Sequence, residues 1–285
     1  MKIERITDLE RQYAMQSLDG QFETHNNYKF VVRLEKAFAE KIGTKHAVGF
    51  VNGTATLHTA LEAAGVTMGD EVIVPPLTMS STSLAVIQAN AIPVFADVDE
   101  KTFLISASDI EKKITPATKA IVAVHMRGVP CNMDRIMEIV KKHNLRLIED
   151  VAQAVGGTYK GKYLGTFGDC GCLSFQYHKV ITAGEGGMIL CKDARIYDRC
   201  CSYHDTAACW RPDRFAEQRF EGELFCGYEY VINRKYDGSQ SEIRYSCCHP
   251  CGLFCPCADR KQGAKSFLLR HSAAIQTAHR LQCGR

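Results

Sequence analysis

The sequence lacks the features that mark a membrane, secreted or nucleic-acid-binding protein. No apolar run approaches the ~20 residues that span a bilayer, and the charged N-terminus has no apolar core followed by a small-residue cleavage site. No block of Lys and Arg suggests a nucleic-acid arm, and 35 basic residues against 32 acidic ones leave a formal charge of only +3. We therefore expect a cytoplasmic protein with no nucleic-acid or membrane partner.

The composition is that of a soluble globular protein, with 46% hydrophobic and 24% charged residues over 285 positions. Cysteine is abundant, at 14 residues. One group of cysteines lies between Cys131 and Cys226, mostly in apolar surroundings where free thiols behave as small buried hydrophobes, and the rest lie between Cys247 and Cys283. In a cytosolic protein both groups stay reduced, which argues against a disulfide framework.

From about residue 30 to residue 191, helical periodicity alternates with short β-branched runs, a pattern that predicts an α/β fold with helices covering a mostly parallel sheet. The predicted helices are Phe30–Ile42, Thr54–Ala64 and Met133–His143. The predicted strands are Glu71–Val74, Ile92–Phe95, Ala120–His125, Leu145–Glu149, Gly171–Phe175 and Gly187–Cys191. Parallel sheets bind ligands beyond the carboxyl ends of their strands. The first candidates for chemistry therefore lie near such ends, and they are Asn52–Thr54, His125, Asp150 and Lys179.

Asn52, Gly53 and Thr54 stand directly before the second predicted helix. A Gly-Thr turn there presents backbone N–H groups and the positive end of a helix dipole, which suit an anion such as a phosphate. Asn and Thr before a helix also act as ordinary caps. The residues alone leave both interpretations open.

Asp150 ends the run LRLIED and is followed by Val-Ala-Gln, so its carboxylate lies at the mouth of the predicted sheet with Gln153 one turn later. A carboxylate there can hold a protonated ring nitrogen in a partly buried site, because charge pairing keeps both groups ionised. The alternative is that Asp150 caps a helix beginning near Val151.

Lys179 is the single lysine in a strand-end loop, with Ser174 five residues before it and the glycine-rich run ITAGEGG after it. Such a position allows the amine to be desolvated and made nucleophilic. Most lysines are solvated surface residues, so it is the surroundings that favour a functional role here.

Together, the runs NGTATLH, EDVAQAVGG, SFQYHK and ITAGEGGMI resemble, in order and spacing, the DegT/StrS family of sugar aminotransferases over roughly residues 25 to 230. The resemblance implies the large domain of fold type I, with helices on both faces of the sheet, and the cofactor pyridoxal 5'-phosphate (PLP). It also implies amino transfer from glutamate or glutamine to a nucleotide-linked keto sugar or a cyclitol ketone, in an enzyme that is a homodimer when intact.

Carried over to this sequence, the resemblance implies Lys179 as the catalytic residue, bound to PLP as a Schiff base. Asp150 would then be the partner of the pyridine nitrogen, and Gln153 a contact to the ring face or hydroxyl. The implied phosphate contacts are Thr54, Ala55 and Ser174. No metal is implied.

The sequence departs from the family pattern at three places. Met79, in the run PPLTMSST, stands where an aromatic residue is expected to stack on the PLP ring, and a thioether can still lie against that face. His178 adjoins the lysine, and a dehydratase branch of the family has histidine in place of the lysine; the spacing from Ser174 favours Lys179. Glu229 replaces an asparagine that reaches the phosphate of the neighbouring subunit, and a carboxylate would repel that phosphate.

We therefore divide the chain into an incomplete PLP-binding large domain, residues 1–230, and an atypical cysteine-rich tail, residues 231–285, with the family's C-terminal small domain absent. The polar segment Arg211–Glu223 is the candidate linker. Read one base later, Lys235–Gln240 permits a family-like Met-Thr-Gly-Ala run, so we hypothesise a frameshift near residues 231–235. The competing interpretation is a zinc site on Cys248, Cys251, Cys255 and Cys257, although no second Cys-x-x-Cys pair has the spacing of a zinc ribbon.

Two functions remain in competition at this point. The first is a PLP-dependent aminotransferase of sugar or cyclitol metabolism. The second is a non-catalytic remnant or regulatory protein that keeps the PLP fold but is inactive because the C-terminal domain is missing.

Overall fold

The computed structural model describes residues 6–20 and 29–204 of the chain. The segment Arg211–Glu223, the Glu229 motif and the cysteine-rich tail from residue 231 lie outside the described residues. The predictions made for them, including the domain boundary, the frameshift and the zinc alternative, therefore stay predictions.

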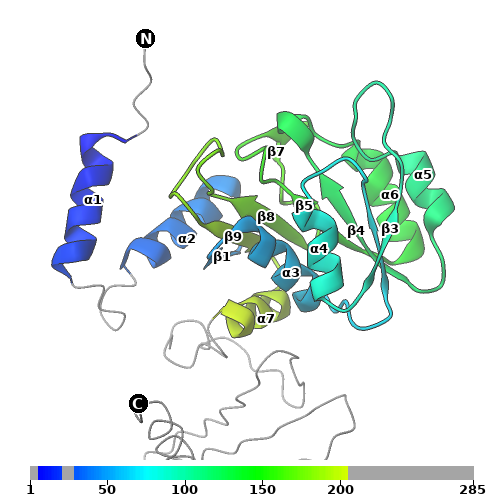
Figure 1. Ribbon diagram of the computed structural model, residues 1–285, viewed down its shortest axis with the longest axis horizontal. Helices are drawn as coiled ribbons and strands as arrows, with labels where there is room; N and C mark the ends of the chain where they lie inside the picture. The colour runs from blue at the N-terminus through cyan, green and yellow to red at the C-terminus, as the bar shows by residue number, and fades with distance from the viewer. Residues whose placement is uncertain (1–5, 21–28, 205–285) are drawn as a thin grey trace, which may run out of the picture. The chain divides into compact units, whose positions relative to one another are not determined.

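A seven-stranded sheet in the order β1-β9-β8-β5-β4-β2-β3 forms the centre of the described part (Figure 1). The strands β8, β5, β4, β2 and β3 pair in parallel, whereas β9 is antiparallel to both β8 and β1. The mostly parallel sheet predicted from the sequence is thus confirmed. The bounds are β1 His46–Phe50, β2 Glu71–Val74, β3 Ile92–Phe95, β4 Thr118–Val124, β5 Arg146–Asp150, β8 Cys170–Ser174 and β9 Gly187–Cys191; β6 Thr158–Tyr159 and β7 Lys162–Tyr163 form a separate hairpin.

Helices cover both faces of the sheet, as predicted. One face packs on α3, α4 and α7, and the other packs on α2, α5 and α6. The three predicted helices are confirmed to within one residue at either end, while the others were not predicted. The bounds are α1 Asp8–Asp19, α2 Lys29–Ile42, α3 Gly53–Ala63, α4 Ser81–Gln88, α5 Ala107–Lys113, α6 Met133–His143 and α7 Ala194–His204.

The end residues of α6 explain why it is predicted so closely. The Asn132 side chain accepts a hydrogen bond from the Arg135 N–H at the start of the helix. At its end, Asn144 adopts the left-handed conformation with φ of 52°, which asparagine tolerates better than most residues. Residues suited to the start and to the end of α6 are thus both present in the sequence.

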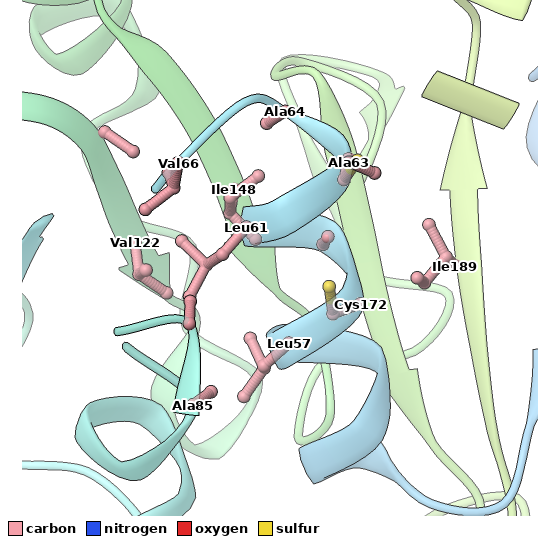
Figure 2. Close-up of a cluster of buried hydrophobic side chains, with 14 of the residues drawn as sticks. Leu57, Leu61, Ala63, Ala64, Val66, Ala85, Val122, Ile148, Cys172 and Ile189 are labelled. Atoms are coloured by element: carbon pink, nitrogen blue, oxygen red, sulfur yellow. The ribbon is translucent and has the colours of Figure 1, made fainter. Parts of the chain in front are cut away.

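Alternation along the strands divides the core into two layers. In β5, Ile148 belongs to the cluster beneath α3, shown in Figure 2 with Leu57, Leu61 and Val122. Its neighbour Leu147 belongs to the cluster beneath α6 on the opposite face. Successive strand residues point to opposite faces of a sheet, so every buried strand contributes to both layers. Between their first residues and their carboxyl ends, the central strands β4 and β5 therefore carry only apolar residues.

The six cysteines of the described residues are free and buried, in agreement with their apolar surroundings in the sequence. Five of them, Cys170, Cys172, Cys191, Cys200 and Cys201, lie in the core cluster beneath α3 and α7. Burial raises the pKa of Cys172 and Cys191 well above its usual value, and burial together with the nearby Glu149 raises the pKa of Cys131 to about 12. These thiols act as apolar packing groups.

The described residues contain neither a helix that could span a membrane nor a cluster of metal-ligating side chains. None of their helices is long and apolar enough to cross a bilayer. Their His, Cys, Asp and Glu side chains form no cluster of three or more that would bind a metal ion.

We predict that these buried thiols resist alkylation in the native protein. The thiolate is the reactive form, so burial and a raised pKa should slow labelling of Cys131 by iodoacetamide on the order of a hundredfold relative to the unfolded chain. Peptide mass spectrometry after a timed reaction at pH 8, with and without guanidinium chloride, measures this ratio. Equal labelling of Cys131 in both samples would contradict its burial in the native fold.

Candidate active site

The candidate site lies where three neighbouring parallel strands end. In the sheet order, β5 stands between β4 and β8, so their carboxyl ends are adjacent. Asp150 ends β5, Ser174 ends β8, and His125 directly follows β4. The register pairs Asp150 with Val124 on one side and with Cys172 on the other. Polar residues that are distant in sequence therefore meet at one edge, as expected for ligand sites in parallel sheets.

The start of α3 packs directly against Ser174. A Cβ added to Gly53 would lie 2.8 Å from the Ser174 Cβ, so only glycine allows this approach. Gly187, which pairs with Ser174, is held equally closely, since its Cβ would lie 2.6 Å from the Asn52 carbonyl oxygen. The structure thus brings the first turn of α3, with the half-buried Thr54 and Ala55, beside the buried Ser174.

Asn52 caps α3, which confirms the cap interpretation for this residue. Its side-chain oxygen accepts a hydrogen bond of 2.8 Å from the Ala55 N–H. A cap satisfies only part of the first turn, because the first four N–H groups of a helix have no partner within the helix. Capping and anion binding are therefore compatible at this helix end.

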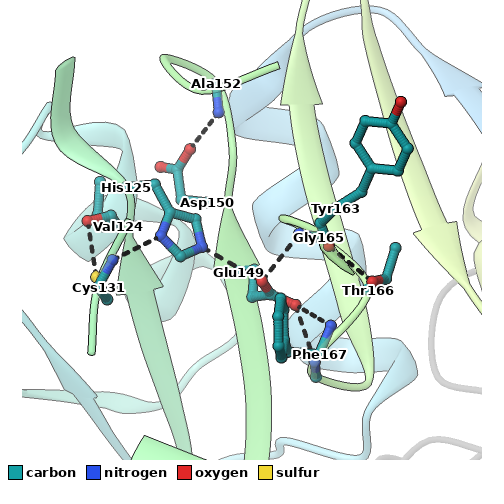
Figure 3. A network of polar contacts seen from close by, with 11 residues as sticks. Val124, His125, Cys131, Glu149, Asp150, Ala152, Tyr163, Gly165, Thr166 and Phe167 are labelled. Carbon is teal, nitrogen blue, oxygen red and sulfur yellow. Dashed lines mark hydrogen bonds and ion pairs between the residues drawn. The ribbon is translucent and has the colours of Figure 1, made fainter. Parts of the chain in front are cut away.

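Asp150 is a buried carboxyl group, 5% exposed, at the end of β5. It accepts a hydrogen bond of 3.0 Å from the Ala152 N–H in a turn (Figure 3), and no helix begins at Val151. The alternative role as a helix cap is therefore wrong. Burial raises the pKa of Asp150, and the Ala152 N–H, the charge of Lys179, the nearby His125 and the Thr82 hydroxyl only partly oppose it. A further cationic partner would stabilise the ionised form of such a buried carboxyl group.

Lys179 lies in the loop that joins β8 to β9. The loop is folded back on itself, because the Lys179 N–H donates to the Gln176 carbonyl at 2.8 Å and Gln176 forms a bridge with Gly184. Lys179 is half-buried, and its charge lowers the pKa of Asp150. Its neighbour His178 is exposed. The structure thus brings Lys179, and not its neighbour, into the surroundings of the buried carboxyl group.

Gln153 and Met79 have surroundings that the sequence did not reveal. The Gln153 side chain accepts from the Arg127 N–H at 3.0 Å and contacts the Met126 sulfur at 3.5 Å, so it holds the turn after β4. Met79 is 62% exposed in the segment before α4. Three residues later, the buried Thr82 interacts with Asp150. Their contacts to a cofactor stay predictions.

Two site residues escaped the sequence analysis, Thr82 and Glu149. Glu149 is fully buried next to Asp150, on the opposite face of β5. Its carboxylate accepts from the N–H groups of Gly165, Phe167 and Gly168 at 2.7 to 2.9 Å. The signal was the Glu-Asp pair at the end of a buried strand, where alternation lets only one carboxylate face the ligand.

Comparison with known proteins identifies this arrangement. The model of the DegT/DnrJ/EryC1/StrS aminotransferase family matches residues 4–234. A GDP-perosamine synthase of Escherichia coli O157:H7 is 46% identical over 199 residues, which are 70% of this chain and 54% of that protein. An L-glutamine:2-deoxy-scyllo-inosose aminotransferase of Streptomyces lividus is 44% identical over 162 residues, 57% of this chain and 38% of that protein.

A solved structure shows the same fold. NtdA of Bacillus subtilis, crystallised with its cofactor PMP bound, superimposes with a TM-score of 0.62 at 30% identity. The match covers 70% of this chain and 46% of NtdA. The chain thus spans about half the length of the proteins it resembles.

We predict that Asp150→Asn stabilises the cofactor-free protein at pH 7. The folded state raises the pKa of this carboxyl group above its ordinary 3.8, so the group costs stability increasingly as the pH rises from that value. Asparagine keeps an oxygen for the Ala152 N–H and removes the cost. The thermal midpoint should rise at pH 7, and the gain should shrink towards pH 4.

The matched control is the adjacent Glu149→Gln, which should destabilise the protein by about 2 kcal/mol because three backbone N–H groups donate to that carboxylate. A lower midpoint for Asp150→Asn at pH 7 would show that the buried carboxyl group is already compensated by its neighbours.

Proposed function

Because the chain belongs to the DegT/DnrJ/EryC1/StrS aminotransferase family, we propose that it carries the PLP-binding large domain of an aminotransferase with Lys179 as its catalytic residue. One observation carries the proposal: Asp150, Lys179 and the start of α3 beside Ser174 converge at the carboxyl ends of adjacent strands. These parts come from segments that are distant in sequence, and each suits a different part of the cofactor.

The residues present fit PLP. Asp150 is a buried carboxyl group whose neighbours do not offset its burial, which suits the protonated ring nitrogen. The first turn of α3 and the Ser174 hydroxyl would hold the phosphate, since N–H groups at a helix start favour an anion. Thr54 and Ala55 would contribute from that turn. The loop of Lys179 supplies an amine for covalent attachment at the aldehyde.

PLP, when bound, supplies an electron sink that stabilises negative charge at the α-carbon of an amino acid. The protein would then contribute position and proton transfer. Lys179 would hold the cofactor until an amino donor displaces its amine, and the freed Nζ would remove the proton from the donor's α-carbon and return it to the cofactor. Asp150 would keep the ring nitrogen protonated, which maintains the electron sink.

The relatives support a class of substrates for this proposal. The names of two relatives specify perosamine synthesis on a GDP-sugar and amino transfer from glutamine to 2-deoxy-scyllo-inosose, a cyclitol ketone. We propose the same class here, with glutamate or glutamine as donor and a nucleotide-linked keto sugar or a cyclitol ketone as acceptor. A cytoplasmic homodimer remains the proposed setting of the activity.

We predict that Lys179 is the residue that binds PLP covalently. Purified protein mixed with PLP should show a visible absorbance band, and borohydride should fix the cofactor to the peptide that contains Lys179. Lys179→Ala should abolish this labelling, while Lys192→Ala, which removes a lysine bound to the Thr166 carbonyl, should leave it intact. Labelling of another lysine with the band retained in Lys179→Ala would overturn the assignment.

We further predict that Asp150→Asn slows the half-reaction with glutamate on the order of a hundredfold or more, because the neutral amide no longer keeps the ring nitrogen protonated. Stopped-flow absorbance of the PLP-loaded protein measures this rate. The same assay separates the competing function, because a non-catalytic PLP-fold protein would bind the cofactor without consuming the donor. An unchanged rate in Asp150→Asn would refute the proposed role of this carboxylate.

A further inference from the structure

Glu149 and His125 form a buried pair that the proposed chemistry does not use. Both side chains are fully buried, and the His125 Nε2 lies 3.3 Å from the Glu149 Oε2 (Figure 3). The same carboxylate receives the N–H groups of Gly165, Phe167 and Gly168. A buried charge needs such compensation, and here both carboxylate oxygens have it. Glu149 therefore has no capacity left for a ligand.

The partners of His125 define its tautomer. The Nδ1 accepts a hydrogen bond of 3.1 Å from the Cys131 N–H, so this nitrogen carries no proton. The proton is then on Nε2, where it points to Glu149. The ring is therefore held at both nitrogens and cannot rotate without losing these hydrogen bonds.

His125 joins the ends of β4 and β5 to the loop that follows β4. Its backbone N–H donates to the Asp150 carbonyl at 3.1 Å, which extends the strand ladder by one residue. The Cys131 thiol donates to the Val124 carbonyl at 3.2 Å, so the base of the loop from 126 to 130 is closed around the imidazole.

The loop closed by His125 contacts Gln153. Arg127 in this loop has a left-handed φ of 53°, a conformation that costs a non-glycine residue free energy. Its N–H is the one that donates to the Gln153 side chain. A fixed loop base therefore determines where the Gln153 amide stands, and the ladder bond determines where Asp150 stands.

We propose that His125, oriented by Glu149, is a positioning residue for the cofactor site. Its ring connects Glu149 to the loop after β4 and thereby sets the place of Gln153, while its backbone N–H holds the end of β5 at Asp150; the side chain itself does not touch the ligand. The inference rests on the proposed function, because it assigns these two residues to PLP. The two adjacent carboxylates would then have different roles. Glu149 holds His125 and the N–H groups of residues 165–168 on one face of β5, and Asp150 faces the ligand on the other.

Two substitutions each keep one of the two hydrogen bonds of the imidazole ring and remove the other. His125→Gln places an amide nitrogen near the position of Nε2 and can still donate to Glu149. His125→Asn places an amide oxygen near the position of Nδ1 and can still accept from Cys131, but it loses the bond to Glu149. The control for general destabilisation is Asp169→Asn, at the opposite end of β5, where Asp169 binds Arg146 at 2.8 Å and the Leu147 N–H at 2.9 Å.

The measurements are the PLP dissociation constant, the visible circular dichroism per bound cofactor, which reports how the ring is oriented, and the thermal midpoint without PLP. His125→Asn should weaken PLP binding about tenfold, the value of a hydrogen bond to a charged group, and should reduce the visible dichroism. His125→Gln should weaken PLP binding by a similar factor, because it loses the acceptor for the Cys131 N–H that closes the base of the loop. Asp169→Asn should lower the thermal midpoint and change neither cofactor property.

The outcomes are distinct. If His125→Asn matches Asp169→Asn, with a lower midpoint but unchanged affinity and dichroism, His125 is a purely structural residue and the proposal is overturned. A PLP affinity within about twofold of the wild type in either variant would likewise overturn it, because the ring hydrogen bond that this variant loses would then not position the site. A wild-type chain that binds no PLP would overturn the proposed function itself, and this role with it.

Discussion

The alternation of side chains along β5 is the constraint on which the site depends. Ile148 must stay in the core beneath α3, and Leu147 must stay in the core beneath α6. Asp150 is thereby forced to the face of Ile148, and Glu149 to the face of Leu147. A slip of one residue would exchange the two carboxylates. Hydrophobic packing of two aliphatic residues thus decides which acid meets a ligand.

Sequence reasoning captured what depends on local pattern. The β-branched runs revealed six of the seven strands of the main sheet, and helical periodicity gave α6 with both its ends. Strand β1 was missed because its five residues, HAVGF, include a glycine and do not alternate between buried and exposed positions. Only the adjacent Ala47 and Val48 are buried. Gly49 lies close to α2, because a Cβ there would lie 3.2 Å from the Val31 Cγ1, and its N–H donates to the Glu35 carboxylate at 2.8 Å. That contact is tertiary, so no window of sequence contains it.

The residues of the candidate site likewise fall into those that the sequence pattern predicts and those that depend on tertiary contacts. Lys179, Asp150 and Ser174 could be named from their places at strand ends and from their resemblance to a family. The contacts of Gln153 with the turn at Arg127 could not, because they depend on a loop whose base is closed by His125 and Cys131. Thr82 was missed for a similar reason, since only the packing of α4 on the sheet brings it to Asp150. A residue's place at the end of a strand can be predicted from the sequence. A place that depends on how a loop folds or how a helix packs cannot.

The loop of Lys179 begins and ends at one pair of neighbouring residues in the sheet. Ser174, the last residue of β8, pairs with Gly187, the first residue of β9. Residues 175–186 therefore form a loop whose two ends are fixed by the pairing of β8 with β9, the pairing that also holds Ser174 beside α3. Insertions or deletions within residues 175–186 would move Lys179 while leaving Ser174 and the start of α3 in place. Evolution can thus vary the position of the proposed catalytic lysine independently of the proposed phosphate contacts.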